Sequence, residues 1–226
     1  MRSATILVIS SIVIIMLWHY PVLDPLKILV VFFHETSHAL ASLLTGGTVL
    51  EMVVETNKGG HVLSSGGNRF IVASAGYLGS LLWGILIYIA ASLSKYDKGI
   101  MGLLGLILLV VTVVFMRNGA GLIFGIVMGS LMSAGAYFLS HAINDILLRI
   151  IGISSMLYVP LDIYDDTIRR AGSVKSDATT IAETIGGTTM LWGILWGLIS
   201  IVTIALCLLW TVRHPELHSV EVDKRH

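Results

Sequence analysis

Three residues within one apolar stretch have the types and spacing of a metal-dependent hydrolase site. In VVFFHETSHALASLL, residues 30–44, His34 and His38 are four positions apart and Glu35 directly follows the first histidine. A helix places residues four apart on one face, so both imidazoles can bind one Zn²⁺. Glu35 can then take a proton from a metal-activated water and return it to a leaving amine. This H-E-x-x-H pattern predicts two metal ligands and a general base.

The apolar setting strengthens this interpretation. An ionisable side chain at the centre of a bilayer costs about 2.5–3.5 kcal/mol on insertion scales, so such residues are rare without a function. The plainer alternative is a pair of buried histidines bonded to the backbone, with Glu35 protonated. Three such groups on one helix favour the metal site.

A catalytic zinc site usually needs a third protein ligand. The acidic cluster in YVPLDIYDD offers Asp162, Asp165 and Asp166 at the end of an apolar run. We expect Pro160 to break or kink a helix there and to create an unwound, ligand-bearing segment buried in protein. One aspartate can bind the metal while another holds a histidine N–H. The alternative is a solvated helix end, where Asp is common.

Composition indicates the elements that must carry this site. The chain has 226 residues, of which 55% are hydrophobic and 12% charged, with a mean hydropathy of +0.88. Soluble domains average about 25% charged residues, so a multi-pass integral membrane protein with the lipid bilayer as partner is expected. The formal net charge of zero argues against a nucleic-acid partner, and the lone Cys207 excludes a cysteine-rich metal site.

Hydropathy predicts an all-α polytopic membrane protein with six to seven transmembrane helices. With ends uncertain by several residues, the expected spans are roughly 4–18, 26–45, 69–93, 99–116, 119–140, 143–163 and 190–211. The fourth and fifth spans are separated only by residues 117–119, which suggests a helical hairpin. We expect one membrane domain over residues 1–212, followed by a polar tail over residues 213–226.

Two segments are too polar to cross a bilayer. Residues 46–67 are rich in β-formers around the turn signal NKGG, which predicts a short surface β-hairpin after the second helix. Its Thr48–Glu55 strand is a candidate edge for holding a substrate extended by β-augmentation, although a purely connecting hairpin is an alternative. Residues 165–189 have helical potential and are expected to lie outside the bilayer.

The segments FFHETSHALASLLTGG, ASAGYLGSLLWG and PLDIYDD resemble the site-two protease family of intramembrane zinc metalloproteases, in particular its compact B branch. The resemblance covers roughly residues 30–198 and includes SDA, residues 176–178, and LWGILWGL, residues 191–198. It implies one Zn²⁺ per chain, His34 and His38 as ligands, Glu35 as general base and Asp162 as third ligand. It further implies hydrolysis of peptide bonds in membrane-embedded or membrane-proximal substrates.

Two departures from the family pattern limit what can be transferred. Ile163 stands where the family has the glycine of L-D-G, so Asp165 and Asp166 remain alternatives to Asp162 as ligand or as its hydrogen-bonded neighbours. Tyr77 and Ser80 stand where the family has the proline and asparagine of A-G-P-x-x-N. In SAGYLGS, the small residues predict close helix packing.

A function of another class is also compatible with these residues. A pseudoprotease that binds transmembrane helices, or a metal carrier, could retain a zinc site without hydrolysing peptides. A carrier is expected to place ligands along successive spans, and a pseudoprotease to have lost Glu35 or a histidine. The clustering and completeness of the motif favour the enzyme.

Overall fold

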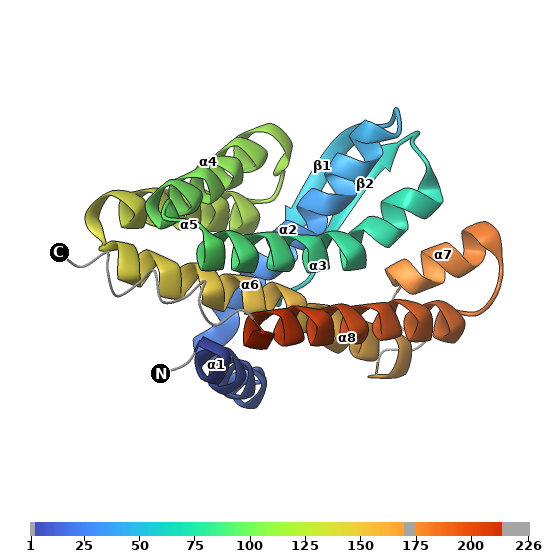
Figure 1. Ribbon diagram of the computed structural model, residues 1–226. Helices are drawn as coiled ribbons and strands as arrows, with labels where there is room; N and C mark the ends of the chain where they lie inside the picture. The colour runs from blue at the N-terminus through green and yellow to red at the C-terminus, as the bar shows by residue number, and fades with distance from the viewer. Residues whose placement is uncertain (1–2, 170–174, 214–226) are drawn as a thin grey trace.

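The computed structural model describes residues 3–169 and 175–213, and these residues are mostly helical (Figure 1). The helices are α1 (Ser3–Leu17), α2 (Asp24–Leu44), α3 (Arg69–Leu93), α4 (Asp97–Phe115), α5 (Gly119–Phe138), α6 (His141–Tyr164), α7 (Asp177–Ile185) and α8 (Thr189–Arg213). A 3-10 turn (Pro21–Leu23) precedes α2, and a π-helical turn (Asp165–Arg169) follows α6. Strands β1 (Thr48–Val54) and β2 (Gly60–Ser65) form an antiparallel hairpin. The predicted polar tail lies outside the described residues beyond position 213.

Five helices in the described part of the chain are long and apolar enough to cross a bilayer. They are α3, α4, α5, α8 and the continuous unit of α6 with its π-helical turn. Helices α1 and α2 meet at a bend of 117° and count together as a sixth candidate span. The all-α polytopic fold and the multi-pass membrane location are therefore confirmed. The number of spans is five or six because α1 and α2 form one bent unit.

Helix α2 lies at the centre of the structure. Every residue from Lys27 to Ala39 is buried, so this helix is covered on all its faces. It packs against α3, α6 and both strands of the hairpin. A helix surrounded in this way is apolar all round except where a polar group has a partner or a function. The polar residues at its centre consequently face protein or a protein-lined cavity.

Glycines bring the neighbouring helices into close contact. A Cβ atom at Gly84 of α3 would lie 2.7 Å from the Gly152 carbonyl oxygen of α6, and the reverse contact would be 2.9 Å. Gly105 of α4 and Gly129 of α5 oppose each other similarly, at 2.8 and 3.0 Å. Small residues at such crossings let helix backbones touch in a membrane. This packing confirms the predicted α4–α5 hairpin and fixes α3 against α6.

The expected helix break at Pro160 is not present. Helix α6 runs through Pro160 to Tyr164 and continues into the π-helical turn, making one helical unit of 29 residues from His141 to Arg169. Membrane helices tolerate proline where neighbouring elements and local changes of helix type absorb the lost backbone bond. Val159 and Ile163 on either side are buried, so packing holds this part of the helix in place.

The hairpin presents β2, rather than β1, as its free edge. Pairing runs from Thr48 opposite Ser65 to Val54 opposite Gly60, with a bulge between Val49 and Glu51. On the other side of β1, the backbone N–H of Arg117 donates to the Met52 carbonyl at 3.1 Å. The Asn118 side chain donates to the Val54 carbonyl at 2.8 Å and accepts from the Val54 N–H at 3.3 Å.

The α4–α5 turn therefore covers the outer edge of β1 over Met52–Val54. The prediction that Thr48–Glu55 supplies an open edge is wrong over this part of the strand. Among the described residues, no strand pairs with the outer edge of β2. The edge available for another strand is Gly60–Ser65.

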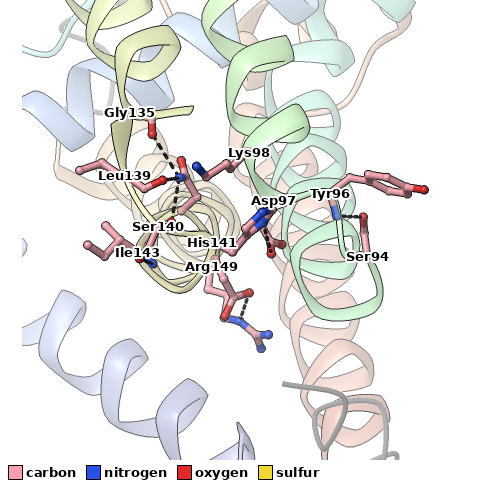
Figure 2. Close-up of polar contacts among 12 residues, drawn as sticks. Ser94, Tyr96, Asp97, Lys98, Gly135, Leu139, Ser140, His141, Ile143 and Arg149 are labelled. Carbon is pink, nitrogen blue, oxygen red and sulfur yellow. Dashed lines mark hydrogen bonds and ion pairs between the residues drawn. The ribbon is translucent and has the colours of Figure 1, made fainter. Parts of the chain in front are cut away.

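A separate polar cluster lies where α3 meets α4 and α5 meets α6 (Figure 2). The buried Asn144 amide donates to the carbonyls of Gly135 and Ser140 at 3.2 and 3.0 Å. Arg149 Nε donates to Asp145 Oδ1 at 2.7 Å. Polar groups inside a membrane bundle are expected to pair in this way. The Asn144 contacts link the start of α6 to the end of α5, and the Arg149–Asp145 pair lies within α6.

Candidate metal centre

The two histidines of α2 face each other across one helical turn. His34 Nε2 and His38 Nε2 are 3.1 Å apart, and both side chains are about nine-tenths buried. The second ring nitrogen of each has its own partner. His38 Nδ1 lies 2.7 Å from the Val72 carbonyl oxygen, and His34 Nδ1 lies 3.3 Å from Ser80 Oγ.

These partners set how the histidines can act. A backbone carbonyl only accepts, so His38 Nδ1 carries a proton and donates it to Val72. In the neutral ring, Nε2 then has a free lone pair, which is the form that binds a metal. Ser80 can accept from His34 Nδ1 in the same manner. Both imidazoles are thus held with Nε2 directed at a common point.

Asp177 brings a third atom that could bind a metal to that point. Its Oδ2 lies 3.2 Å from His34 Nε2 and 3.1 Å from His38 Nε2. Two atoms bound to a tetrahedral Zn²⁺ at about 2.0–2.1 Å lie roughly 3.3 Å apart. The three atoms therefore form a nearly equilateral triangle of the size that one zinc ion requires. Within the described ranges, His34, His38 and Asp177 are the histidine, cysteine or acidic residues that lie close enough together to hold a metal.

Local structure explains why Asp177 reaches the histidines. It is the first residue of α7, directly after Ser176, whose hydroxyl caps the helix by accepting from the Thr179 N–H at 3.2 Å. The first turn of a helix favours a carboxylate electrostatically. Ala178 and Ile181 are fully buried and hold α7 against its neighbours α3 and α8.

The histidines also keep the Asp177 carboxyl charged. Burial on its own would raise the pKa of Asp177, but His38 and His34 outweigh burial through charge and hydrogen bonding. The pKa of this carboxyl is consequently below its ordinary value. An ionised carboxylate is the form that binds a metal.

Gly76 of α3 lies directly against the three atoms of the triangle. A Cβ atom there would collide with Asp177 Oδ2 and with Nε2 of both histidines. The absence of a side chain at this position keeps the space between the three ligand atoms free. Three residues along α3, Gly79 makes a similarly close contact with Ser37. The predicted role of SAGYLGS in packing α3 against α2 is thereby confirmed.

Glu35 faces a cavity beside the histidines. The cavity has a volume of about 770 Å³ and is lined by residues of α2, β2, α3, α6 and α7, including both histidines, Glu35 and Asp177. Glu35 is 4% exposed, and its Oε2 has no hydrogen-bond partner among the described residues. Gly60, at the start of β2, lies so close that a Cβ atom there would be 2.7 Å from Glu35 Oε1. A buried carboxylate with a free oxygen beside ligand-type nitrogens is suited to accept a proton.

The acidic residues predicted from YVPLDIYDD occupy other places. Asp162 and Asp166 line the same cavity but are not in the ligand group, and Asp165 Oδ1 accepts from Arg169 at 3.2 Å on the exposed side of the helix. The structure thus brings Asp177 to the two histidines, whereas Asp162, the third ligand expected from the sequence, lies elsewhere in the cavity lining. The continuous helix at Pro160 explains the outcome, because no unwound segment carries Asp162 to the histidines.

Asp162 and Asp166 contact two tyrosines whose rings lie against His34. The Tyr77 hydroxyl donates to Asp166 Oδ2 at 2.6 Å, and Tyr158 forms a hydrogen bond with Asp162. Both tyrosine rings contact the His34 ring edge-on, with centroids 6.0 and 5.7 Å away. The aspartates thus bond the two aromatic residues that pack against His34.

One comparison with known proteins gives a match. The family described as Peptidase M50B-like matches residues 7–207 of the chain. Searches of curated proteins and of solved structures gave no match. The matched range includes α2, α3, α6 and α7, which together carry every residue of the candidate metal centre.

Proposed function

The chain belongs to the Peptidase M50B-like family, and on this premise we propose that it is an intramembrane zinc endopeptidase. Its membership supports protease activity in a membrane-embedded protein. The finer proposal is that His34, His38 and Asp177 hold one Zn²⁺ and that Glu35 is the general base. The observation that carries it is the triangle of ligand atoms, 3.1–3.2 Å on each side, next to a buried carboxylate.

The residues around the centre can perform each part of peptide hydrolysis. A zinc ion bound there would activate a water molecule and polarise the scissile carbonyl. Glu35 Oε2 takes a proton as the water oxygen adds to the carbonyl carbon, and it gives that proton to the leaving nitrogen when the C–N bond breaks. The surrounding apolar residues of α2 exclude bulk water, which strengthens these charge interactions.

Strand β2 is the proposed binding edge for the substrate. A peptide bond in a helix is shielded, so the substrate must be extended before it can be cut. Residues 60–64 of β2 line the cavity and Gly60 touches Glu35. An extended segment pairing with the outer edge of β2 would pass in front of the general base. Replacing alternate backbone N–H groups of a peptide substrate by N-methyl should therefore weaken binding, and equal binding would contradict edge pairing.

A carrier function has less support from the same structure. A carrier needs ligands along a path, whereas the described residues contain one group that could hold a metal. A pseudoprotease would share the metal site and differ in lacking cleavage. The functional test therefore has to measure metal and cleavage together.

The decisive comparison is the parent chain against Glu35→Gln. Both proteins are purified in detergent, their zinc content is measured, and both are incubated with the same single-span membrane protein substrates. We expect one zinc per chain in each and cleavage by the parent alone. Cleavage by Glu35→Gln at the parent's rate would refute the assigned base. Zinc without cleavage in either protein would support the pseudoprotease.

A further inference from the structure

The opening of the cavity is basic, whereas its interior is acidic. The exposed charged side chains among its lining residues are Lys58, Arg69 and Lys175, which are 38, 57 and 54% exposed, and His61 beside them is 59% exposed. The lining carboxylates lie deeper, with Glu35 buried and the Asp177 side chain 20% exposed. A segment that enters from the surface meets positive charge first.

The first basic cluster contains Lys27, Lys58 and Asp24. Lys27 Nζ lies 2.6 Å from Asp24 Oδ1, whereas Lys58 Nζ lies 3.5 Å from the same oxygen. Lys27 is buried and its ammonium group also donates to the Trp18 carbonyl at 2.9 Å. One carboxylate therefore serves two ammonium groups, and the exposed Lys58 is the weaker partner. Glu55 lies in the same turn, where its carboxylate accepts from the Asn57 amide at 2.7 Å, so the exposed Lys58 ammonium is the cation of this cluster that an incoming carboxylate can reach.

The second basic cluster contains Arg69, Lys175 and Glu183. Glu183 Oε2 lies 2.6 Å from Lys175 Nζ and 3.2 Å from Arg69 Nη2. The hydrogen bond from Lys175 lowers the pKa of Glu183, so this carboxylate is charged at neutral pH. Again two cations share one anion, which leaves one positive charge in surplus among the described residues. All three groups are about half exposed, so an incoming carboxylate can reach them.

The two clusters lie at opposite ends of β2. Lys58 precedes Gly60, where the strand begins, and Arg69 follows Ser65, where it ends. The strand has six residues, and six extended residues span roughly 20 Å. A peptide paired along β2 therefore has one end beside each cluster, and its residues opposite Gly60 lie beside Glu35.

We propose that the cavity selects membrane-protein segments that carry acidic side chains on both sides of the cleaved bond, roughly six residues apart. One acidic side chain would pair with Lys58 and the other with Arg69 or Lys175. This inference rests on the proposed function, because it assigns the substrate class of that same site. The same charges could attract anionic lipid headgroups, but their placement at the two ends of one free strand favours an extended peptide.

The test uses the full zinc-loaded chain in phosphatidylcholine vesicles. The substrates are single-span model proteins whose two flanking positions are both Asp, both Asn or both Lys. We expect kcat/KM for the Asp substrate to exceed that for the Lys substrate roughly threefold to twentyfold, the range for two exposed ion pairs. The difference should shrink at high salt, because exposed charges are screened.

Charge reversal in the enzyme should reverse the preference. Lys58→Glu combined with Arg69→Glu is expected to cleave the Lys substrate faster than the Asp substrate. Lys95→Glu is the matched control, since Lys95 is exposed at the opposite end of α3 from Arg69 and away from the cavity lining. It should keep the parent's preference. A double variant that loses activity equally toward all three substrates would overturn the inference.

A binding measurement separates this inference from the proposed function. Glu35→Gln should bind Asp-flanked peptides more tightly than Lys-flanked peptides even if no substrate is cleaved. Equal binding of both peptides would overturn the charge selection while leaving the peptidase proposal intact. A preference that appears only in vesicles containing phosphatidylglycerol would assign the basic clusters to lipid and would also overturn it.

Discussion

His38 Nε2 lies 3.1 Å from Asp177 Oδ2, although the first residue belongs to the central helix α2 and the second to the short helix α7. The buried side chains of α7, Ala178 and Ile181, pack it against the bundle, and Asp177 at its N-terminus completes the ligand group. The proposed zinc would thus link α2, which carries H-E-x-x-H, to α7, which hydropathy places outside the bilayer.

Gly76→Ala should weaken zinc binding strongly while leaving the chain folded. The added Cβ would lie where the three ligand atoms converge, so it competes with the ion for the same space. We expect an affinity loss of at least about tenfold, the scale on which small displacements of a metal site act. Isothermal titration with zinc, together with helicity from circular dichroism, would measure both effects.

The control for this variant is Gly102→Ala. A Cβ atom at Gly102 of α4 meets only the Ala136 Cβ at 3.4 Å, which is an ordinary contact. This substitution should leave zinc affinity unchanged. If Gly76→Ala also binds zinc with the parent's affinity, the ion does not lie between the three proposed ligands.

Ser80→Ala should weaken zinc binding about tenfold through the orientation of His34. The hydroxyl lies 3.3 Å from His34 Nδ1, and its loss leaves that N–H without its partner. Ser154→Ala is the matched control, because Ser154 is also fully buried but its hydroxyl has no partner in the described residues. Equal zinc affinity in the two variants would show that Ser80 does not position the ligand.

Asn118→Ala should destabilise the hairpin without removing zinc. The amide makes two hydrogen bonds with the Val54 backbone, and their loss should cost about 1–3 kcal/mol of unfolding free energy. Asn118 makes no side-chain capping bond to α5, so the effect belongs to the hairpin. Thermal unfolding in detergent measures it.

Arg117→Ala provides the comparison for that experiment. The Arg117 side chain bonds carbonyls at the end of α4, whereas its backbone N–H, which binds Met52, survives the substitution. It should leave the hairpin paired and the melting temperature closer to that of the parent. A larger loss of stability in Arg117→Ala than in Asn118→Ala would contradict the assigned role of Asn118.

The sequence supports the prediction of elements whose causes are local. Long apolar runs predicted the membrane helices, the NKGG turn predicted the hairpin, and the spacing of His34 and His38 predicted two ligand atoms on one helical face. Each of these features depends on residues that are neighbours in the chain. The structure confirms the fold class for this reason.

The third ligand depends on tertiary packing, and there the sequence prediction (Asp162) differs from the residue that the structure places beside the histidines (Asp177). Asp177 lies in a polar segment, and hydropathy gives no sign that such a segment returns to the histidines. The available signal was SDA, in which a serine cap precedes an aspartate at the start of an amphipathic helix. This signal identifies Asp177 as a candidate ligand only if α7 is known to pack beside Gly76. Pro160 and the covered edge of β1 are further cases in which neighbouring elements overrule a local preference.

The most direct test of the metal centre is the zinc content of Asp177→Ala beside that of Asp162→Ala. Both proteins are purified identically, checked for helicity, and measured by atomic emission after removal of loosely bound metal. We predict that Asp162→Ala retains close to one zinc per chain and that Asp177→Ala retains almost none. Full zinc content in Asp177→Ala, with loss in Asp162→Ala, would contradict the metal centre and restore Asp162 as the third ligand.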